Sequence, residues 1–218
     1  MKIAAASLLV FSGLTTACVN SSTLQTAKAM DPGSQRFLVG GGYYTSPQIN
    51  ADASAAAGSD TKLALPYAEV GYRRGIIDHL ELGAKATIPG TVGLDGKYQF
   101  LDIGDFALAT GVGVGYLQIS SGTEGMETKS TIVDTTVPLY ASYDIAKPFA
   151  VYTAPKYVLR YASSTNAMDE TKTGLDHMVG GTVGTRLGSR WGLFIETSYL
   201  RSVTNDFSSF QVNSSIFF

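Results

Sequence analysis

The sequence predicts an all-β protein, an antiparallel up-and-down transmembrane β-barrel of about ten strands, within a range of about eight to twelve. Three observations favour this fold class. Successive segments alternate apolar with polar residues at the period of two that belongs to β-strands. The connections between these segments are alternately short and long, as in a meander whose two ends face different surroundings. Charged residues make up only 16% of the 218 residues, while Gly (24) and Tyr (12) are abundant.

The chain begins with a pattern typical of export. In MKIAAASLLVFSGLTTAC, Lys2 precedes an apolar run from Ile3 to Leu14, and small residues lead to Cys18. This run is too short to span a bilayer, and no stop-transfer pattern follows it, so residues 1–17 are predicted to be a signal peptide. Residues 18–34 are small and polar with a Pro-Gly break. We expect them to form a periplasmic tether, which leaves residues 35–218 for the barrel.

Cys18 is the only cysteine of the chain, so it cannot form an internal disulfide. The stretch from Leu14 to Cys18, LTTAC, resembles the bacterial lipobox, in which the cysteine is acylated and becomes the new N-terminus. Thr15 stands where this family usually has Leu, and ordinary cleavage near Ala17 is therefore the alternative. The resemblance implies a lipoprotein anchored at Cys18, and Val19 after the cysteine implies sorting to the outer membrane.

Ten strand-like segments follow the N-terminal region. In the third of them, Leu80, Leu82 and Ile88 share one face, whereas Glu81 and Lys85 lie on the other. Strands are expected near residues 36–45, 64–74, 79–88, 94–101, 105–119, 131–143, 149–161, 177–187, 191–201 and 207–218.

Three prolines, Pro66, Pro138 and Pro155, fall within expected strands. A closed barrel uses every backbone N–H group, and proline has none to donate. We therefore expect these prolines to mark bulges or strand ends.

Three connections, 46–63, 120–130 and 162–176, are long and rich in Ala, Ser, Thr and Asp. The connections that alternate with them are short, such as 75–78 and 144–148. Outer-membrane barrels have short periplasmic turns and longer external loops. With ten strands, the pattern predicts that both chain termini lie on the side of the short turns and that the long loops lie on the outside of the cell.

The apolar face of the strands could point inward or outward. A soluble barrel would turn it inward, as ligand-holding calycins do. The outward orientation is favoured because aromatic residues gather near strand ends, where a bilayer has its interfaces. These aromatic residues are Tyr43, Tyr116, Tyr143, Tyr161, Trp191, Tyr199 and Phe218.

The last expected strand alternates as well, with Phe210, Val212, Ile216 and Phe218 on one face and Phe217 on the lumen side. An apolar, alternating strand with a terminal aromatic residue resembles the recognition signal that outer-membrane barrels present to their assembly machinery. In a closed barrel this strand would pair with the first one, so that no edge stays open.

A second resemblance covers the stretch GIIDHLELGAK, residues 75–85. It is similar to a turn-plus-strand sequence of many small bacterial outer-membrane barrels. Together with LQTAK at residues 24–28, the mature chain resembles outer-membrane barrel lipoproteins of Gram-negative bacteria. The resemblance implies outer-membrane lipids and the barrel-assembly machinery as partners, and it implies no activity.

The inward face is expected to carry nearly balanced charge. Eight strands leave an interior about filled by side chains, whereas 16–18 strands leave a channel. Charges confined in a narrow lumen should pair with one another, and the sequence therefore predicts a polar, largely plugged lumen. The basic members are Arg73, Lys85, Lys97, Lys156, Arg160 and Arg186, and the acidic members are Glu69, Glu81, Asp95, Asp134 and Glu196.

For function, we expect a structural or surface-interaction barrel whose three long loops offer a surface to an extracellular ligand. A narrow pore for small solutes or ions is the alternative. A rim hydrolase using Asp176 and His177 is a distant alternative, because no hydrolase motif accompanies this pair. An enzyme is therefore not expected.

Other functional classes find little support. His79 follows a tight turn and is expected to be a solvated turn residue, and the carboxylates of 169–176 resemble a solvated cluster more than a calcium site. No metal or cofactor is expected. The net charge of −2 offers no basic field for nucleic acid.

Overall fold

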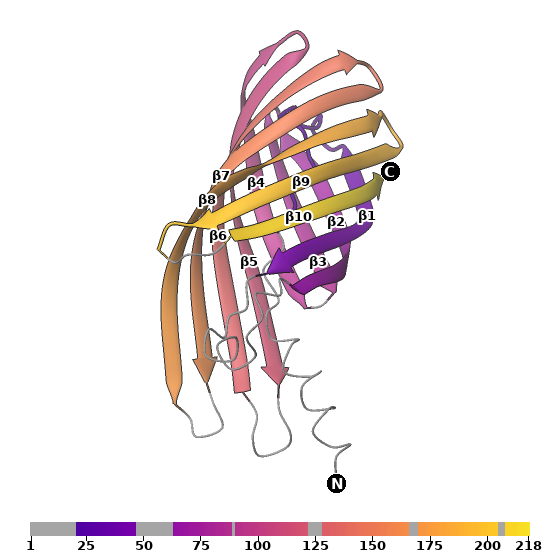
Figure 1. The fold of residues 1–218 in the computed structure, drawn as a ribbon. Helices are drawn as coiled ribbons and strands as arrows, with labels where there is room; N and C mark the ends of the chain where they lie inside the picture. The colour runs from indigo at the N-terminus through magenta and orange to yellow at the C-terminus, as the bar shows by residue number, and fades with distance from the viewer. Residues whose placement is uncertain (1–20, 47–62, 89, 122–127, 166–169, 205–207) are drawn as a thin grey trace.

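Ten antiparallel strands form a closed barrel in the computed structural model (Figure 1). The structure describes residues 21–46, 63–88, 90–121, 128–165, 170–204 and 208–218. The predicted fold class and strand number are confirmed. In chain order the strands are β1 (Gln35–Ser46), β2 (Leu63–Ile77), β3 (Leu80–Ile88), β4 (Thr91–Ile103), β5 (Phe106–Ser121), β6 (Thr128–Ala146), β7 (Phe149–Thr165), β8 (Thr171–Gly188), β9 (Gly192–Ser202) and β10 (Ser208–Phe217).

The barrel closes where the first and last strands meet. β1 pairs with β2 on one side and with β10 on the other, so that Val39 lies opposite both Val70 and Ile216. Every other strand pairs with its neighbours in the sequence. The ten described strands therefore leave no open sheet edge, as a wall exposed to lipid requires.

β5 to β8 are longer than the sequence predicts. β5 continues to Ser121, β6 begins at Thr128, and β7 and β8 pair as far as Thr165 and Thr171. Hydroxyl side chains support this extension by bonding across the strands, as between Thr165 and Thr171 at 3.0 Å. In Figure 1 these four strands reach beyond the others toward the bottom of the view.

Because of this extension, the predicted bounds of two of the three long loops were wrong. Much of 120–130 and 162–176 is strand, and the ladder there shortens the surface expected to meet an extracellular ligand. The third loop, 46–63, lies almost wholly outside the described residues.

The prolines are accommodated within the strands. β6 and β7 pair as far as Pro138, opposite Lys156, and pair again from Ala141, opposite Thr153. Between these points the residues of the two strands, including Pro155 of β7, are not paired with one another. Pairing between β5 and β6 is likewise interrupted at Pro138, between Thr136 and Leu139. Pro66 keeps its position in β2 opposite Tyr43. The missing N–H groups of proline therefore interrupt two ladders locally without changing the number of strands.

Alternate residues of each strand point outward and into the lumen. The inner face holds charged side chains that are almost fully buried, including Glu81, Lys97 and Glu196, each 1% exposed. Among the described residues there is no helix long and apolar enough to cross a membrane. The exposed outer face is apolar, with Val39, Val70, Leu94, Val112, Val114, Leu139, Val183 and Ile195.

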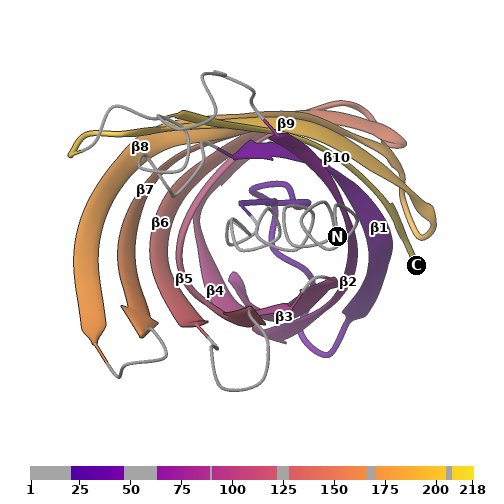
Figure 2. The same ribbon diagram turned by 60° about the horizontal axis from the view of Figure 1, so that its bottom comes forward.

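Residues 21–34, which we call the luminal segment, run from the exposed residues 31–34 at one end of the barrel into the lumen, where residues 21–30 are buried or half-buried (Figure 2). At the end with the short turns, the amide of Gly33 donates to the carbonyl oxygen of Gly75 at 2.9 Å, and the amide of Gly75 donates to that of Ser34 at 3.0 Å. From this point the chain runs into the lumen as far as Ser21, whose amide donates to Gln211. The expectation of a tether for these residues is corrected, because the wall supplies partners for their polar backbone.

Candidate functional site: the occupied lumen

Arg73 joins the largest group of charges in the lumen. Its Nε lies 2.7 Å from Glu81 Oε1, and its Nη2 lies 2.6 Å from Asp95 Oδ2. Lys97 Nζ approaches the same Glu81 oxygen at 3.2 Å. Two cations and two carboxylates from β2, β3 and β4 thus neutralise one another within a buried space, as confined charges require.

Gly83 makes this group sterically feasible. It lies on β3 between Arg73 of β2 and Asp95 of β4. A Cβ atom on Gly83 would come within 2.6 Å of Arg73 Nη1 and 2.8 Å of Asp95 Oδ1. The Arg73–Asp95 ion pair therefore crosses directly over a residue that has no side chain, which is the role of a strand glycine at a close approach.

Two further ion pairs bridge neighbouring parts of the wall. Arg160 holds Asp134 in a bidentate arrangement, with distances of 2.8 and 2.7 Å. Arg186 reaches Asp144 at 3.2 Å, and Lys28 of the luminal segment approaches the same carboxylate at 2.9 Å. The last pair lies at the end of the short turns and fixes the segment to the wall.

The remaining inward charges bind the luminal segment directly. Lys156 donates to the carbonyl oxygen of Ser21, and Lys85 donates to that of Ser22 at 2.8 Å. Glu69 accepts a hydrogen bond of 2.6 Å from the Ser22 hydroxyl. These three side chains were expected to pair with other charges of the wall, whereas in the structure they also form hydrogen bonds with the luminal segment.

Glu196 binds two consecutive backbone amides of the segment. Its carboxylate accepts the backbone amides of Thr23 at 2.7 Å and Leu24 at 2.8 Å. The Tyr152 hydroxyl and the Asn213 side-chain amide each donate to it at 2.8 Å. Four neutral donors thus solvate a carboxylate that is 1% exposed, which is how a buried charge is satisfied by charge-assisted hydrogen bonds.

The luminal segment also packs two apolar side chains against the wall. Leu24 is buried at the end of the lumen near the short turns, and Ala27 is fully buried further along the segment. The side chains around Leu24 are Leu38, Tyr152, Phe194 and Phe217. Those around Ala27 are Ala107, Ala109, Tyr140 and Ala154.

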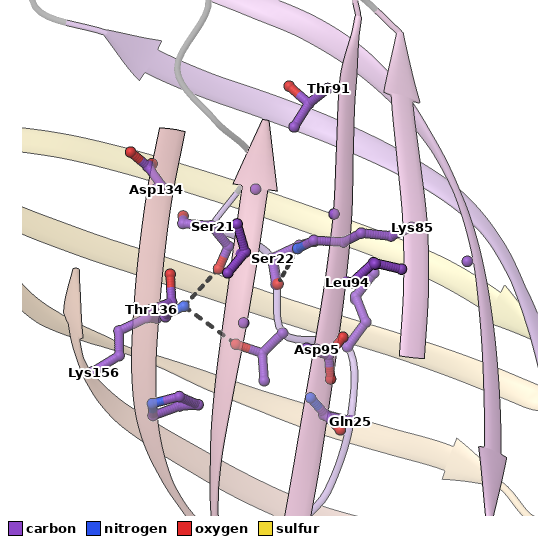
Figure 3. Close-up of a pocket in the computed structure, with 18 of the residues that line it drawn as sticks. Ser21, Ser22, Gln25, Lys85, Thr91, Leu94, Asp95, Asp134, Thr136 and Lys156 are labelled. Atoms are coloured by element: carbon purple, nitrogen blue, oxygen red, sulfur yellow. Dashed lines mark hydrogen bonds between the residues drawn. The ribbon is translucent and has the colours of Figure 1, made fainter. Parts of the chain in front are cut away.

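A cavity of about 90 Å³ remains beside the luminal segment. Figure 3 shows Lys85 and Lys156 reaching from its wall to Ser21, Ser22 and their neighbours. Asp95 and Asp134 also line it. A cavity of this size, into which charged side chains point, has room for several water molecules.

Asp176 and His177 do not form a catalytic pair. Asp176 points inward and accepts a hydrogen bond of 2.6 Å from Ser202, whereas the ring of His177 contacts the Tyr157 hydroxyl on the outer face. Successive residues of a strand point to opposite faces, so β8 separates the two side chains. His79 lies in the turn between β2 and β3 with φ 67°.

The residues of the predicted assembly signal lie on the faces that the sequence indicates. Phe210, Val212, Ile216 and Phe218 are all exposed on the outer face, and Phe217 is fully buried in the lumen. Cys18 lies outside the described residues. Within the part of the chain that the structure describes, no three metal-ligating side chains come together.

Sequence reasoning missed several luminal residues. Arg36 was not assigned to the lumen, although its guanidinium lies 4.9 Å from the centre of the Phe217 ring. Arg36 lies two residues before Leu38 and therefore on the same face of β1, and Leu38 is buried in the lumen whereas Val39 is exposed outside. This two-residue period was the signal that could have placed Arg36 in the lumen. The luminal segment itself was missed, because small polar residues beside a Pro-Gly break are also typical of a linker.

The fold and the lumen together define a class of protein. It is a ten-stranded antiparallel barrel with an apolar outer face and a polar lumen that the chain's own N-terminal residues partly fill.

Comparisons with known proteins yield remote similarities of fold. No family model matches the sequence, and no curated protein matches it. The chain is similar to the attachment invasion locus protein Ail of Yersinia pestis, with 8% identity over 87% of this chain and 100% of that chain, at a TM-score of 0.46. It is also similar to neisserial surface protein A, with 9% identity, 84% and 94% coverage and a TM-score of 0.42.

A third similarity is to the translocator domain of the autotransporter NalP from Neisseria meningitidis. It has 10% identity, covers 100% of this chain and 95% of that chain, and has a TM-score of 0.46. Similarities at this level carry no argument about function, which rests below on the residues of this chain.

Proposed function

We propose that this protein spans the bacterial outer membrane as a structural or surface-interaction barrel whose lumen is plugged by the luminal segment. The observation that carries this proposal is the reversed distribution of side chains: apolar residues cover the outside, and buried charges bind the protein's own backbone inside. Each strand has at least the 9 residues of β3, and a tilted strand of roughly that length crosses the hydrocarbon core of a bilayer.

Two groups of exposed aromatic residues support the membrane orientation. Aromatic girdles mark the two interfaces of transmembrane barrels, and aliphatic side chains lie between the groups here. Ring contacts link four members of the first group. Phe37 lies 5.0 Å from Tyr72 in a tilted arrangement, and Phe218 stacks on Phe37 at 6.0 Å and on Trp191 at 5.3 Å. The exposed members near the short turns are Phe37, Phe100, Tyr143, Trp191 and Phe218, joined by the half-buried Tyr72, and the group nearer the opposite end is Tyr43, Tyr116, Tyr161, Tyr199 and Phe210.

A plugged lumen is favoured over the alternative of a narrow pore. Ten strands are close to the number at which side chains alone fill a barrel. Wall charges and the luminal segment satisfy one another across the interior, and the cavity that remains beside the segment measures about 90 Å³. An ion would have to displace the segment in order to cross.

A lipid anchor at Cys18 remains part of the proposal. The position of the luminal segment limits how far such an anchor can reach. Ser21 contacts Gln211, which lies six residues, or about 20 Å along the strand, from Phe217 at the short-turn end. The three residues from Ser21 to Cys18 span at most about 11 Å. A lipid in the leaflet at the short-turn end therefore requires the segment to leave the lumen, so acylation there and plugging are alternative states.

An enzymatic role is not proposed. The rim hydrolase would need Asp176 to orient or activate His177, and the wall of the barrel lies between the two side chains. No other pair of a histidine and a carboxylate was predicted from the sequence.

The test combines membrane fractionation with conductance. The protein should appear in the outer-membrane fraction and should migrate differently on a gel before and after boiling, as closed barrels do. Purified protein in planar bilayers should show little or no conductance. A soluble fraction without heat-modifiable migration would refute the membrane barrel, and ready conductance of the unmodified protein would refute the plug and favour the pore.

A further inference from the structure

The wall of the lumen contacts the backbone of the luminal segment along most of its length. Lysine side chains donate to its carbonyl oxygens, and polar or acidic side chains accept from its amides. Lys97, for example, donates to the carbonyl oxygens of Thr26 at 2.6 Å and Lys28 at 3.1 Å. The amides of Ala27, Ala29 and Met30 donate to Ser142 (3.1 Å), Gln99 (2.6 Å) and Glu81 (3.1 Å).

Contacts of this kind recognise a peptide backbone whatever side chains it carries, here a backbone that turns at Leu24 with φ 46°. Amide and carbonyl groups are common to all peptides, so these bonds provide affinity without a requirement for sequence. Residues 21–26 belong to no helix or strand. The segment could therefore leave the lumen without breaking any strand pair of the barrel.

Two contacts do depend on the side chain. Leu24, 3% exposed, fills a pocket formed mainly by aromatic rings, and Ala27, 0% exposed, lies against small wall residues. The first pocket suits a large apolar side chain. The second leaves room for a methyl group only, because Ala107, Ala109 and Ala154 surround it together with the Tyr140 ring.

We propose that the lumen is a binding site for a peptide with Leu three residues before Ala, whose backbone turns at the Leu as it does at Leu24 (φ 46°), and that the luminal segment occupies this site in cis. A segment of this kind from another chain is bound in trans when the cis segment leaves. The inference rests on the plugged lumen proposed above and adds to it the chemistry of the occupant: a backbone held by Lys85, Lys97, Lys156 and Glu196, with one large and one small apolar side chain.

The test uses a full-length variant whose wall is intact and whose own segment is weakened, Leu24→Asp with Ala27→Leu. A labelled peptide with the sequence of residues 21–30 is added to the detergent-solubilised barrel, and binding is measured by fluorescence anisotropy. The double variant should bind one peptide per barrel. The wild-type protein should bind it at least about tenfold more weakly, because a tethered competitor has an effective concentration on the order of millimolar.

Peptide variants separate the two sources of recognition. Replacing the peptide's Leu by Asp, or its Ala by Leu, should weaken binding by about tenfold or more, since a fully buried leucine side chain contributes that much and a filled methyl pocket excludes a larger group. A peptide that keeps only this Leu and Ala, with Ser and Thr elsewhere, should bind within about fivefold of the parent. A scrambled peptide is the control for adherence to the outer surface.

Absence of peptide binding to a double variant that is heat-modifiable overturns the inference. The proposal of a plugged lumen is tested separately: it still holds if the wild-type protein shows no conductance in planar bilayers, even when no peptide binds. Equal binding of parent and scrambled peptides also overturns the inference. Should the variant fail to fold, wild-type protein with excess peptide is followed by amide hydrogen exchange: faster exchange at Thr23, Leu24 and Ala27 supports displacement in trans, and unchanged exchange refutes it.

Discussion

Replacing Glu196 by Gln should release the luminal segment while leaving the barrel closed. The buried carboxylate accepts the amides of Thr23 and Leu24 at 2.7 and 2.8 Å. A hydrogen bond to a charged group contributes about 1.5–3 kcal/mol, so weakening these two contacts should cost the bound segment about 3 kcal/mol. That corresponds to an opening equilibrium shifted by roughly 100-fold. The cost arises from backbone amides that lose an ionised acceptor, rather than from a cation left without a partner.

Amide hydrogen exchange of the detergent-solubilised protein measures this shift. In Glu196→Gln, the amides of Thr23 and Leu24 should exchange up to about 100-fold faster, and conductance in planar bilayers should rise. Asp134→Asn is the matched control, because that carboxylate binds Arg160 of the wall. It should lower stability and leave exchange at Thr23 and Leu24 within about twofold. Unchanged exchange in Glu196→Gln would mean that the carboxylate does not hold the segment.

Three further predictions concern other parts of the barrel. Phe217→Ala should lower the free energy of unfolding by about 3–5 kcal/mol, because this ring is fully buried, whereas Phe218→Ala, at an exposed ring, should mainly reduce the amount of barrel assembled; equal effects on unfolding in both variants would contradict the observed faces of β10. Gly83→Val should destabilise the barrel in chemical denaturation, since its side chain would occupy the space of the ion pair that crosses over it; an unchanged midpoint would show that this ion pair contributes nothing. Cys18→Ser should abolish any incorporation of labelled acyl chains and preserve heat-modifiable migration, and wild-type protein without label would point to ordinary cleavage near this position.

Phe217 shows what the structure adds to a prediction made from parity alone. The period of two correctly places its side chain in the lumen, but it does not indicate what the ring contacts there. In the structure its ring packs on Phe194 with centres 4.9 Å apart, and it belongs to the same apolar cluster as Leu24. A cluster of residues from β1, β7, β9, β10 and the luminal segment is a long-range feature that parity cannot indicate.

The sequence by itself determined the strands, their approximate limits and the face on which each side chain lies. These properties are local, because the two-residue period and the turn residues act within a few positions of one another. Hence Glu81 and Lys97 were placed in the lumen, and the closure of β1 onto β10 was expected. The lengths of β5 to β8 were underestimated, since their Ser- and Thr-rich ends pair only when both strands of a hairpin are present.

Only the tertiary structure decided what fills the lumen. Residues 21–34 carry few apolar side chains, so their composition is equally that of a linker. Their position depends on groups brought together from distant strands, such as Lys85 of β3, Lys156 of β7 and Glu196 of β9. Each of these contacts joins residues more than sixty positions apart in the chain. They exist because barrel closure directs buried charges at the backbone of one segment, where a charge without a partner would be costly.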